Sequence, residues 1–246
     1  MRTLRRVLAW SCPMLLLASC RAPLPSYPTR PVEESLRVLA SRASQLQTFS
    51  GAGSLTVRDP DRGSVTLEAA IVARRPDQVR VRAWKLGRSV ADITLDGDRV
   101  EGETDPRVDR DTLVEGVRAL RTVLLWVDGA FYERAARDAG TDGATIRARG
   151  TVAGVPGPVL AGIERRTLTL RSLEIEGNDA GGSGAGSFTL DRYREVEGMV
   201  WPMRISASSH DRQAVFRLDW VELNTPIARG ALPERADPDR DGGGGP

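Results

Sequence analysis

The chain has 246 residues, of which 40% are hydrophobic and 5% aromatic, with 35 basic and 33 acidic side chains and two cysteines. The small positive charge comes from Arg2, Arg5 and Arg6 at the start, so the rest of the chain lacks the basic excess typical of nucleic-acid binding. Both cysteines, Cys12 and Cys20, lie at the N-terminal end, which excludes a disulfide framework or a cysteine metal site in the remainder.

The N-terminus has the parts of a secretory signal. An apolar run, residues 7–18, follows the basic residues and leads through small residues into Cys20. This run is shorter than the roughly 20 residues that a membrane-spanning helix needs. Its ending, Leu17-Ala18-Ser19-Cys20, resembles the bacterial lipobox, which implies cleavage of residues 1–19 and acylation of Cys20. Two or more acyl chains would anchor the protein stably to a membrane without crossing it. An ordinary signal with a chance cysteine is the alternative.

The sequence predicts no regular secondary structure at either end of the mature chain. Residues 20–31 combine the lipidated cysteine with four prolines, which indicates an extended tether that rises about 3 Å per residue and spaces the domain about 30 Å from the lipid. Residues 234–246 are rich in glycine and aspartate and predict a disordered tail. One domain is therefore expected over residues 32–233.

The first half of this domain changes from a helical to a strand pattern. Apolar side chains at helical spacing predict an amphipathic helix over residues 32–48. From Phe49 the period becomes two, which predicts a run of strands up to Glu103. Turns are expected at residues 59–63 and at Asp96-Gly97.

The second half repeats this order. Helical spacing predicts a helix over residues 111–127. Strand-like runs follow at residues 144–153, 167–176, 186–194, 200–208 and 213–223. The alternation slips at Arg171-Ser172, which predicts a β-bulge there. Because short turns join antiparallel strands, a parallel doubly wound sheet is excluded. We predict an α+β fold, mainly β: one strongly curved antiparallel sheet with two helices covering its concave face.

Three stretches resemble the outer-membrane lipoprotein-localisation family, which includes the periplasmic carrier LolA and the membrane receptor LolB. Residues 76–103 contain Pro-Asp-Gln-Val-Arg-Val-Arg-Ala and then Leu-Gly-Arg-Ser; residues 124–129 read Leu-Leu-Trp-Val-Asp-Gly; and residues 201–220 contain Trp-Pro-Met-Arg-Ile and Phe-Arg-Leu-Asp-Trp. The resemblance, especially to the receptor, implies an open, unclosed β-barrel. In this fold helices cover an apolar cavity that accepts the acyl chains of lipoproteins in transit.

The resemblance also implies a lipid-transfer loop. The receptor needs a protruding hairpin loop, with a leucine next to a glycine, to deliver its cargo into the membrane. Leu86 and Gly87 match these positions, preceded by Trp84 and Lys85 where the receptor usually has Asn-Pro. We expect Trp84 and Leu86 to be exposed together at a hairpin tip. The alternative is that Trp84 folds back on the sheet and Leu86 is an ordinary turn residue.

An unclosed sheet must have its apolar inner face covered, because exposure costs roughly 25 cal/mol per Å². Helix side chains or a bound ligand can supply the cover. The candidate cavity-lining residues are Leu113, Val117, Leu120, Leu124, Trp126, Phe216 and Trp220. The alternative is that these side chains fill the space and that no ligand enters.

No pattern in the chain supports catalysis. His210 is the single histidine and lies in a polar turn, and residues 182–186 lack the second flanking glycine of a nucleophile elbow. The aspartates near the C-terminus begin like a calcium loop, but the bidentate acid that such a loop requires does not follow. We therefore expect no enzyme activity, no metal and no cofactor.

These observations together predict a lipid-anchored binding protein. Arg21, rather than aspartate, follows Cys20, which resembles the rule that sorts lipoproteins to the outer membrane, here with the domain facing the periplasm. The expected partners are the membrane, acyl chains or lipoproteins, and a periplasmic LolA-like carrier. Nucleic acid is not expected, and the protein is expected to be a monomer. The competing interpretation is a structural or protein-interaction lipoprotein of the envelope without lipid transfer; an enzyme acting on envelope polymer is a distant third.

Overall fold

The computed structural model describes residues 24–61, 63–108, 110–124, 129–135, 139–152, 155, 157–176, 186–209 and 211–233. The expected signal, Cys20, Trp126, His210 and the expected tail lie outside these ranges. In chain order the elements are α1 (Val32–Gln45), β1 (Thr48–Asp59), β2 (Gly63–Arg74), β3 (Gln78–Lys85), β4 (Arg88–Asp96), β5 (Arg99–Thr104), α2 (Arg110–Leu124), α3 (Gly129–Ala135), β6 (Gly140–Thr141), β7 (Thr145–Thr151), β8 (Pro158–Glu164), β9 (Thr169–Ile175), β10 (Gly186–Val196), β11 (Met199–Ser209) and β12 (Arg212–Leu223).

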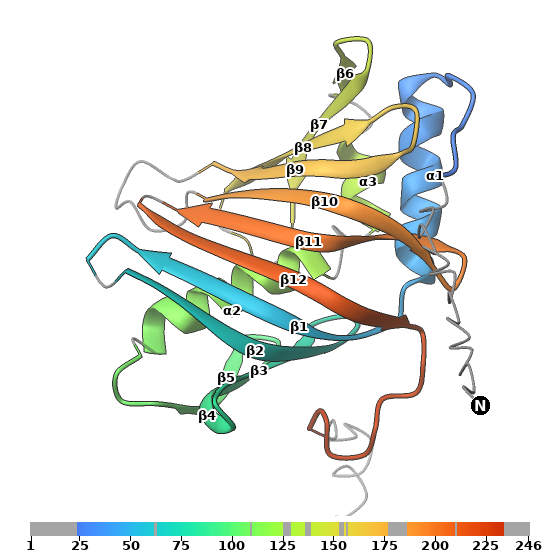
Figure 1. Cartoon of the computed structure of the whole chain (residues 1–246). Helices are drawn as coiled ribbons and strands as arrows, with labels where there is room; N and C mark the ends of the chain where they lie inside the picture. Colours follow the sequence, from blue (N-terminus) through green and yellow to red (C-terminus); the bar gives the residue numbers. More distant parts are fainter. Residues whose placement is uncertain are drawn as a thin grey trace, which may run out of the picture.

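The strands form one twelve-stranded antiparallel sheet in the order β5-β4-β3-β2-β1-β12-β11-β10-β9-β8-β7-β6 (Figure 1). The order places β5 and β6 at opposite ends, so the sheet is open. Within the sheet, the pairing of β1 with β12 is the seam that joins the strands before α2 to the strands after α3. The predicted open antiparallel sheet is confirmed.

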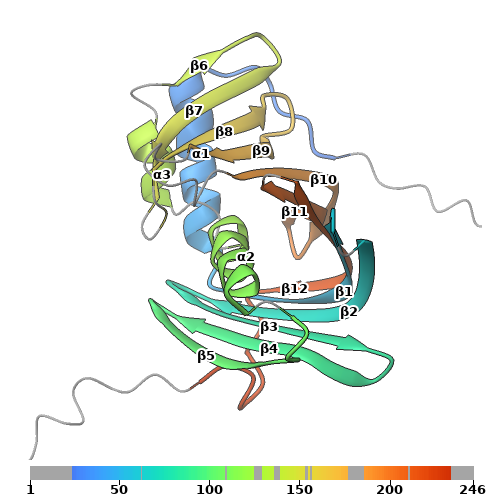
Figure 2. The same cartoon turned by 90° about the vertical axis from the view of Figure 1, so that its left-hand side faces the viewer.

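The helices lie on the concave side of the sheet, which curls around them (Figure 2). Helix α2 lies against β3 and β4, while α1 packs on α3 and α3 packs on β7. The buried apolar side chains of helices and strands form one core between the two layers. The two predicted helices are confirmed as α1 and α2. Helix α3 is an addition, because seven residues are too few to produce a clear helical repeat.

The predicted bulge at Arg171 is confirmed. Gly162 of β8 pairs with Ser172 of β9 and the next residue, Ile163, pairs with Leu170, so Arg171 is left without a paired residue. Strand β8 itself is not among the predicted strands. Proline and glycine are depleted in strands, so Pro158 at its start and Gly162 within it obscure the alternation of its buried residues.

A second bulge, in β12, overturns the expected position of Trp220. Ala52 of β1 pairs with Trp220, but the next residue, Gly53, pairs with Leu218, so Asp219 is the extra residue. The insertion reverses the alternation of the strand. Leu218 stays buried on the inner face, whereas Trp220 is 48% exposed and lies on the outer face, so the prediction that it lines a cavity is wrong.

The proline-rich segment is extended, as predicted, but residues 24–31 do not form a free spacer. The backbone N–H of Tyr27 donates a 2.8 Å hydrogen bond to the carbonyl oxygen of Arg166. The guanidinium of Arg42 lies 4.6 Å from the centre of the Tyr27 ring. Leu24 and Tyr27 are partly buried against the core. The expected separation of 30 Å between domain and lipid is therefore wrong for this part of the segment, which belongs to the domain.

Candidate functional site

The inner face of the sheet is closed at one end and open at the other. At the closed end Phe49 is buried and stacks on Trp201, with ring centres 5.0 Å apart. Towards the β1–β2 turn the inward side chains become only half-buried. We name these residues the open inner strip: Leu55, Val57, Val65, Leu67, Ala207 and Ala214.

Strand pairing makes the open inner strip continuous. Val57 pairs with Val65 on one side and with Ala214 on the other, and Ala214 pairs with Ala207. One step inward, Leu55 pairs with Leu67 and with the buried Phe216. The strip therefore crosses four neighbouring strands, about 14 Å at the usual strand spacing. It ends against the buried core, so an apolar chain could lie on it without meeting a charged side chain of the strip.

The predicted cavity-lining residues differ in how deeply the structure buries them. Val117 and Phe216 are buried in the core. Leu113 and Leu120 of α2 are partly buried against that core. The side chain of Leu124 is not described, and Trp126 lies outside the described residues. Phe216, which pairs with Leu55, therefore adjoins the open inner strip, whereas Leu113, Val117 and Leu120 lie in the core or pack against it.

The residues of the open inner strip were not among the predicted lining residues. Their alternation on β1 and β2 is visible in the sequence and predicts that they point to the inner face. The alternation does not show how far the helices extend over the inner face. Only the placement of α1, α2 and α3 shows which end of the inner face stays half-exposed.

Two tyrosines of the core, Tyr132 and Tyr193, are buried. Burial raises the pKa of Tyr132 and of Tyr193, so both phenols remain neutral at physiological pH. The hydroxyl of Tyr193 donates a hydrogen bond to the carbonyl oxygen of Leu170. Among the described residues no group of three or more His, Cys, Asp or Glu side chains could hold a metal ion.

Leu86 lies at the tip of the β3–β4 hairpin and is 94% exposed. It forms a two-residue turn with Gly87, and both residues have positive φ angles, +51° and +75°. Asn-Gly is the usual sequence of such a turn. Leucine in the left-handed region costs roughly 1–2 kcal/mol. A leucine that is both strained and exposed contributes nothing to folding, which marks it as a functional candidate.

One of the three neighbours of Leu86, Trp84, is less exposed than the sequence predicts. Lys85 and Arg88 pair with each other at the base of the turn and are exposed. Trp84 is half-buried instead, and the guanidinium of Arg82 lies 5.1 Å from its ring centre on the outer face of the sheet. The prediction that Trp84 and Leu86 protrude together is therefore wrong for Trp84. The tip presents one leucine between two basic side chains.

Neither a protein-family model nor a curated protein sequence matches this chain. Solved structures do resemble it. A LolA superfamily protein from Nitrosomonas europaea is 11% identical, with 80% of this chain and 96% of that chain covered and a TM-score of 0.51. A DUF1329 family protein from Desulfovibrio piger is 8% identical, with 81% and 96% covered and a TM-score of 0.50. At this identity the likeness establishes the fold alone: the chain has a LolA-like open β-barrel.

Proposed function

We propose that the protein binds acyl chains on the open inner strip and receives or inserts lipoproteins at the membrane to which Cys20 anchors it. The observation that carries this proposal is the continuous, half-exposed apolar surface that crosses the inner face of β2, β1, β12 and β11, where a folded domain would ordinarily bury such side chains. The LolA-like fold and the exposed Leu86 hairpin support it. We place the protein on the periplasmic face of the outer membrane, with a LolA-like carrier as its donor.

The proposal has a direct energetic basis. Each methylene group of an acyl chain that leaves water contributes roughly 0.8 kcal/mol, and the apolar side chains that it covers gain further. Saturated chains need no hydrogen-bond partners, so a purely apolar strip is a sufficient binding surface. The open end of the inner face would admit a chain without unfolding the core, because the strip residues are half-exposed already.

Leu67→Arg is expected to weaken binding of a lipophilic dye by at least about tenfold, because it places a charge where the acyl chain would lie and removes a contact worth roughly 1.5–3 kcal/mol. Thr66→Arg is the matched control. It adds the same charge at the neighbouring position of β2, whose side chain points to the outer face. Fluorescence titration measures binding, and circular dichroism checks that the sheet is intact. A folded wild-type chain that binds no dye and copurifies no lipid would favour the structural or protein-interaction role.

Cys20→Ser is expected to leave an unprocessed or soluble protein, since it removes all the proposed acyl chains. No described helix has the length and apolar character that crossing a bilayer requires. Because Leu24 and Tyr27 pack on the domain, an anchor at Cys20 would hold the domain close to the lipid. Cys12→Ser, within the expected signal, is the control. Fractionation after a high-salt wash provides the measurement, and a Cys20→Ser protein that stays in the membrane would contradict the anchor.

A further inference from the structure

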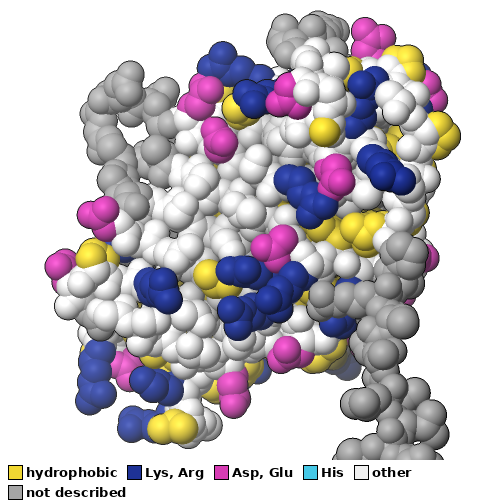
Figure 3. Space-filling view, turned by 45° about the horizontal axis from the view of Figure 1, so that its top comes forward, with side chains coloured by type: hydrophobic (Ala, Val, Ile, Leu, Met, Phe, Trp, Pro, Cys, Tyr) yellow, Lys and Arg dark blue, Asp and Glu magenta, His cyan; other side chains and the backbone are white. Residues whose placement is uncertain are grey.

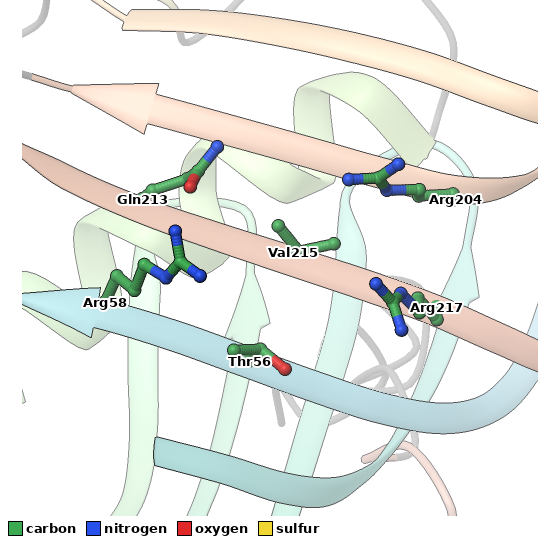
Figure 4. Close-up of a pocket in the computed structure, with 6 residues that line it drawn as sticks. All are labelled: Thr56, Arg58, Arg204, Gln213, Val215 and Arg217. Atoms are coloured by element: carbon green, nitrogen blue, oxygen red, sulfur yellow. The ribbon is translucent and has the colours of Figure 1, made fainter. Parts of the chain in front are cut away.

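The outer face of the sheet, opposite the open inner strip, carries a second candidate site. Figure 3 shows Lys and Arg side chains gathered over this face. A shallow hollow of about 140 Å³ lies there, whereas roughly 10–15 Å³ is enough to hold one water. Its lining comes from β1, β11 and β12: Thr56, Arg58, Arg204, Gln213, Val215 and Arg217 (Figure 4). We name this hollow the arginine hollow.

Strand register brings the arginines together. Arg204 of β11 pairs directly with Arg217 of β12, and Arg58 of β1 pairs with Gln213 of β12. Figure 4 shows the guanidinium of Arg58 on one side of Val215 and those of Arg204 and Arg217 on the other. Like charges at directly opposed positions of a sheet are destabilising. The repulsion between Arg204 and Arg217 therefore lowers the stability of the folded state, so a contribution to folding does not explain why the two arginines are paired.

The positive charge of the arginine hollow is only partly neutralised. The Nη1 atom of Arg204 lies 3.6 Å from Oδ2 of Asp191, and its buried Nε has no hydrogen-bond partner among the described residues. Within the described ranges Arg58 and Arg217 form no ion pair. Glu68 lies on the same face two strands from Arg217, and within the described ranges the two side chains form no ion pair. Among the described residues, the three guanidinium groups of the arginine hollow therefore have one carboxylate in contact, that of Asp191 with Arg204.

We propose that the arginine hollow binds a small oxyanion of the phosphoryl class. Guanidinium groups present planar donor pairs that match the oxygens of phosphate, and several of them around one hollow supply both charge and geometry. The Gln213 amide adds a neutral donor beside them, and the Thr56 hydroxyl, which shares a hydrogen bond with the Thr66 hydroxyl, lines the same hollow. The ligand is either a free phosphate monoester or the phosphodiester of a lipid headgroup.

Two probes distinguish these sources. The full chain, purified in a non-ionic detergent at low ionic strength, is titrated calorimetrically with inorganic phosphate and separately with glycerophosphoglycerol, the headgroup of deacylated phosphatidylglycerol. Binding of phosphate alone supports the proposal with a monoester ligand. Binding of the diester supports it with a lipid headgroup. Binding of neither probe overturns it.

Variants connect binding to the arginine hollow. Arg58→Gln and Arg217→Gln are each expected to weaken binding at least about tenfold, while the melting temperature stays the same or rises in Arg217→Gln because the repulsion from Arg204 is relieved. Arg99→Gln on β5 is the matched control, since it removes an exposed arginine that pairs with Glu101 far from the hollow. Equal weakening in Arg99→Gln would indicate general surface charge and overturn the proposal.

Discussion

Leu86→Glu is expected to abolish insertion of the β3–β4 hairpin into lipid bilayers, and with it delivery of a lipoprotein to liposomes, without changing the melting temperature. The leucine is 94% exposed, so its replacement removes no packing in the free protein. In the bilayer the variant loses the transfer of a leucine side chain, roughly 1.5–3 kcal/mol, and places a carboxylate there instead. The lost leucine transfer alone should lower delivery at least about tenfold, and the cost of placing a carboxylate in the bilayer should abolish what remains.

Lys85 and Arg88 give this prediction a second observable. Basic side chains near an anionic surface contribute about 1 kcal/mol each, and salt screens that attraction. Insertion of the wild-type hairpin should therefore increase with the fraction of anionic lipid and decrease with ionic strength. A folded Leu86→Glu protein that delivers lipoprotein normally would show that this tip has no role in transfer. If Leu86→Glu unfolds the protein, Leu86 belongs to the core.

A further variant separates function from folding at the same position. Leu86→Asn is expected to raise stability slightly, since asparagine tolerates positive φ better than leucine, and still to lose insertion. Leu168 is the matched comparison, because it also has a positive φ, +50°, but is only 4% exposed. Leu168→Asn should destabilise the protein by roughly 2–5 kcal/mol, as other truncations of buried leucines do.

Gly53→Ala is expected to destabilise the protein by roughly 4 kcal/mol or more, among the largest effects of single substitutions. A Cβ atom at Gly53 would lie 1.9 Å from the carbonyl oxygen of Arg217 and 3.0 Å from the amide nitrogen of Asp219. Both atoms belong to the backbone of the β12 bulge, so a flexible side chain cannot move aside. Relief requires the β1–β12 seam to open, and that seam joins the two halves of the sheet.

Gly186→Ala in β10 is the matched control for this prediction. The nearest atom to its added Cβ is the carbonyl oxygen of Ser208 at 3.6 Å, an ordinary contact. Its effect should lie between neutral and a gain of about 1 kcal/mol, because alanine restricts the unfolded chain. Urea unfolding measures both variants. A loss below about 1 kcal/mol in Gly53→Ala, well under the usual range for a backbone clash, would mean that the bulge does not depend on glycine.

Local sequence patterns were sufficient for most elements of this fold. The spacing of apolar residues predicts α1 and α2, and Asp96-Gly97 predicts the β4–β5 turn. The slip in alternation at Arg171 predicts its bulge, because the missing step is visible within one strand. The hairpin tip at Leu86 was predictable for the same reason: two alternating strands flank it, and a two-residue turn between them has nowhere to bury a side chain.

Contacts between distant segments decided the rest. The direction of Trp220 depends on a bulge that exists only when β12 pairs with β1 opposite Gly53, so the alternation within β12 pointed to the wrong face. The open inner strip depends on how far three helices extend over the sheet. The arginine hollow unites Arg58 with Arg204 and Arg217 across the β1–β12 seam. The alternation of apolar residues shows which way a side chain points relative to its own strand. The register between two strands, and the part of the sheet that a helix covers, depend on pairs of elements. Only the tertiary structure supplies them.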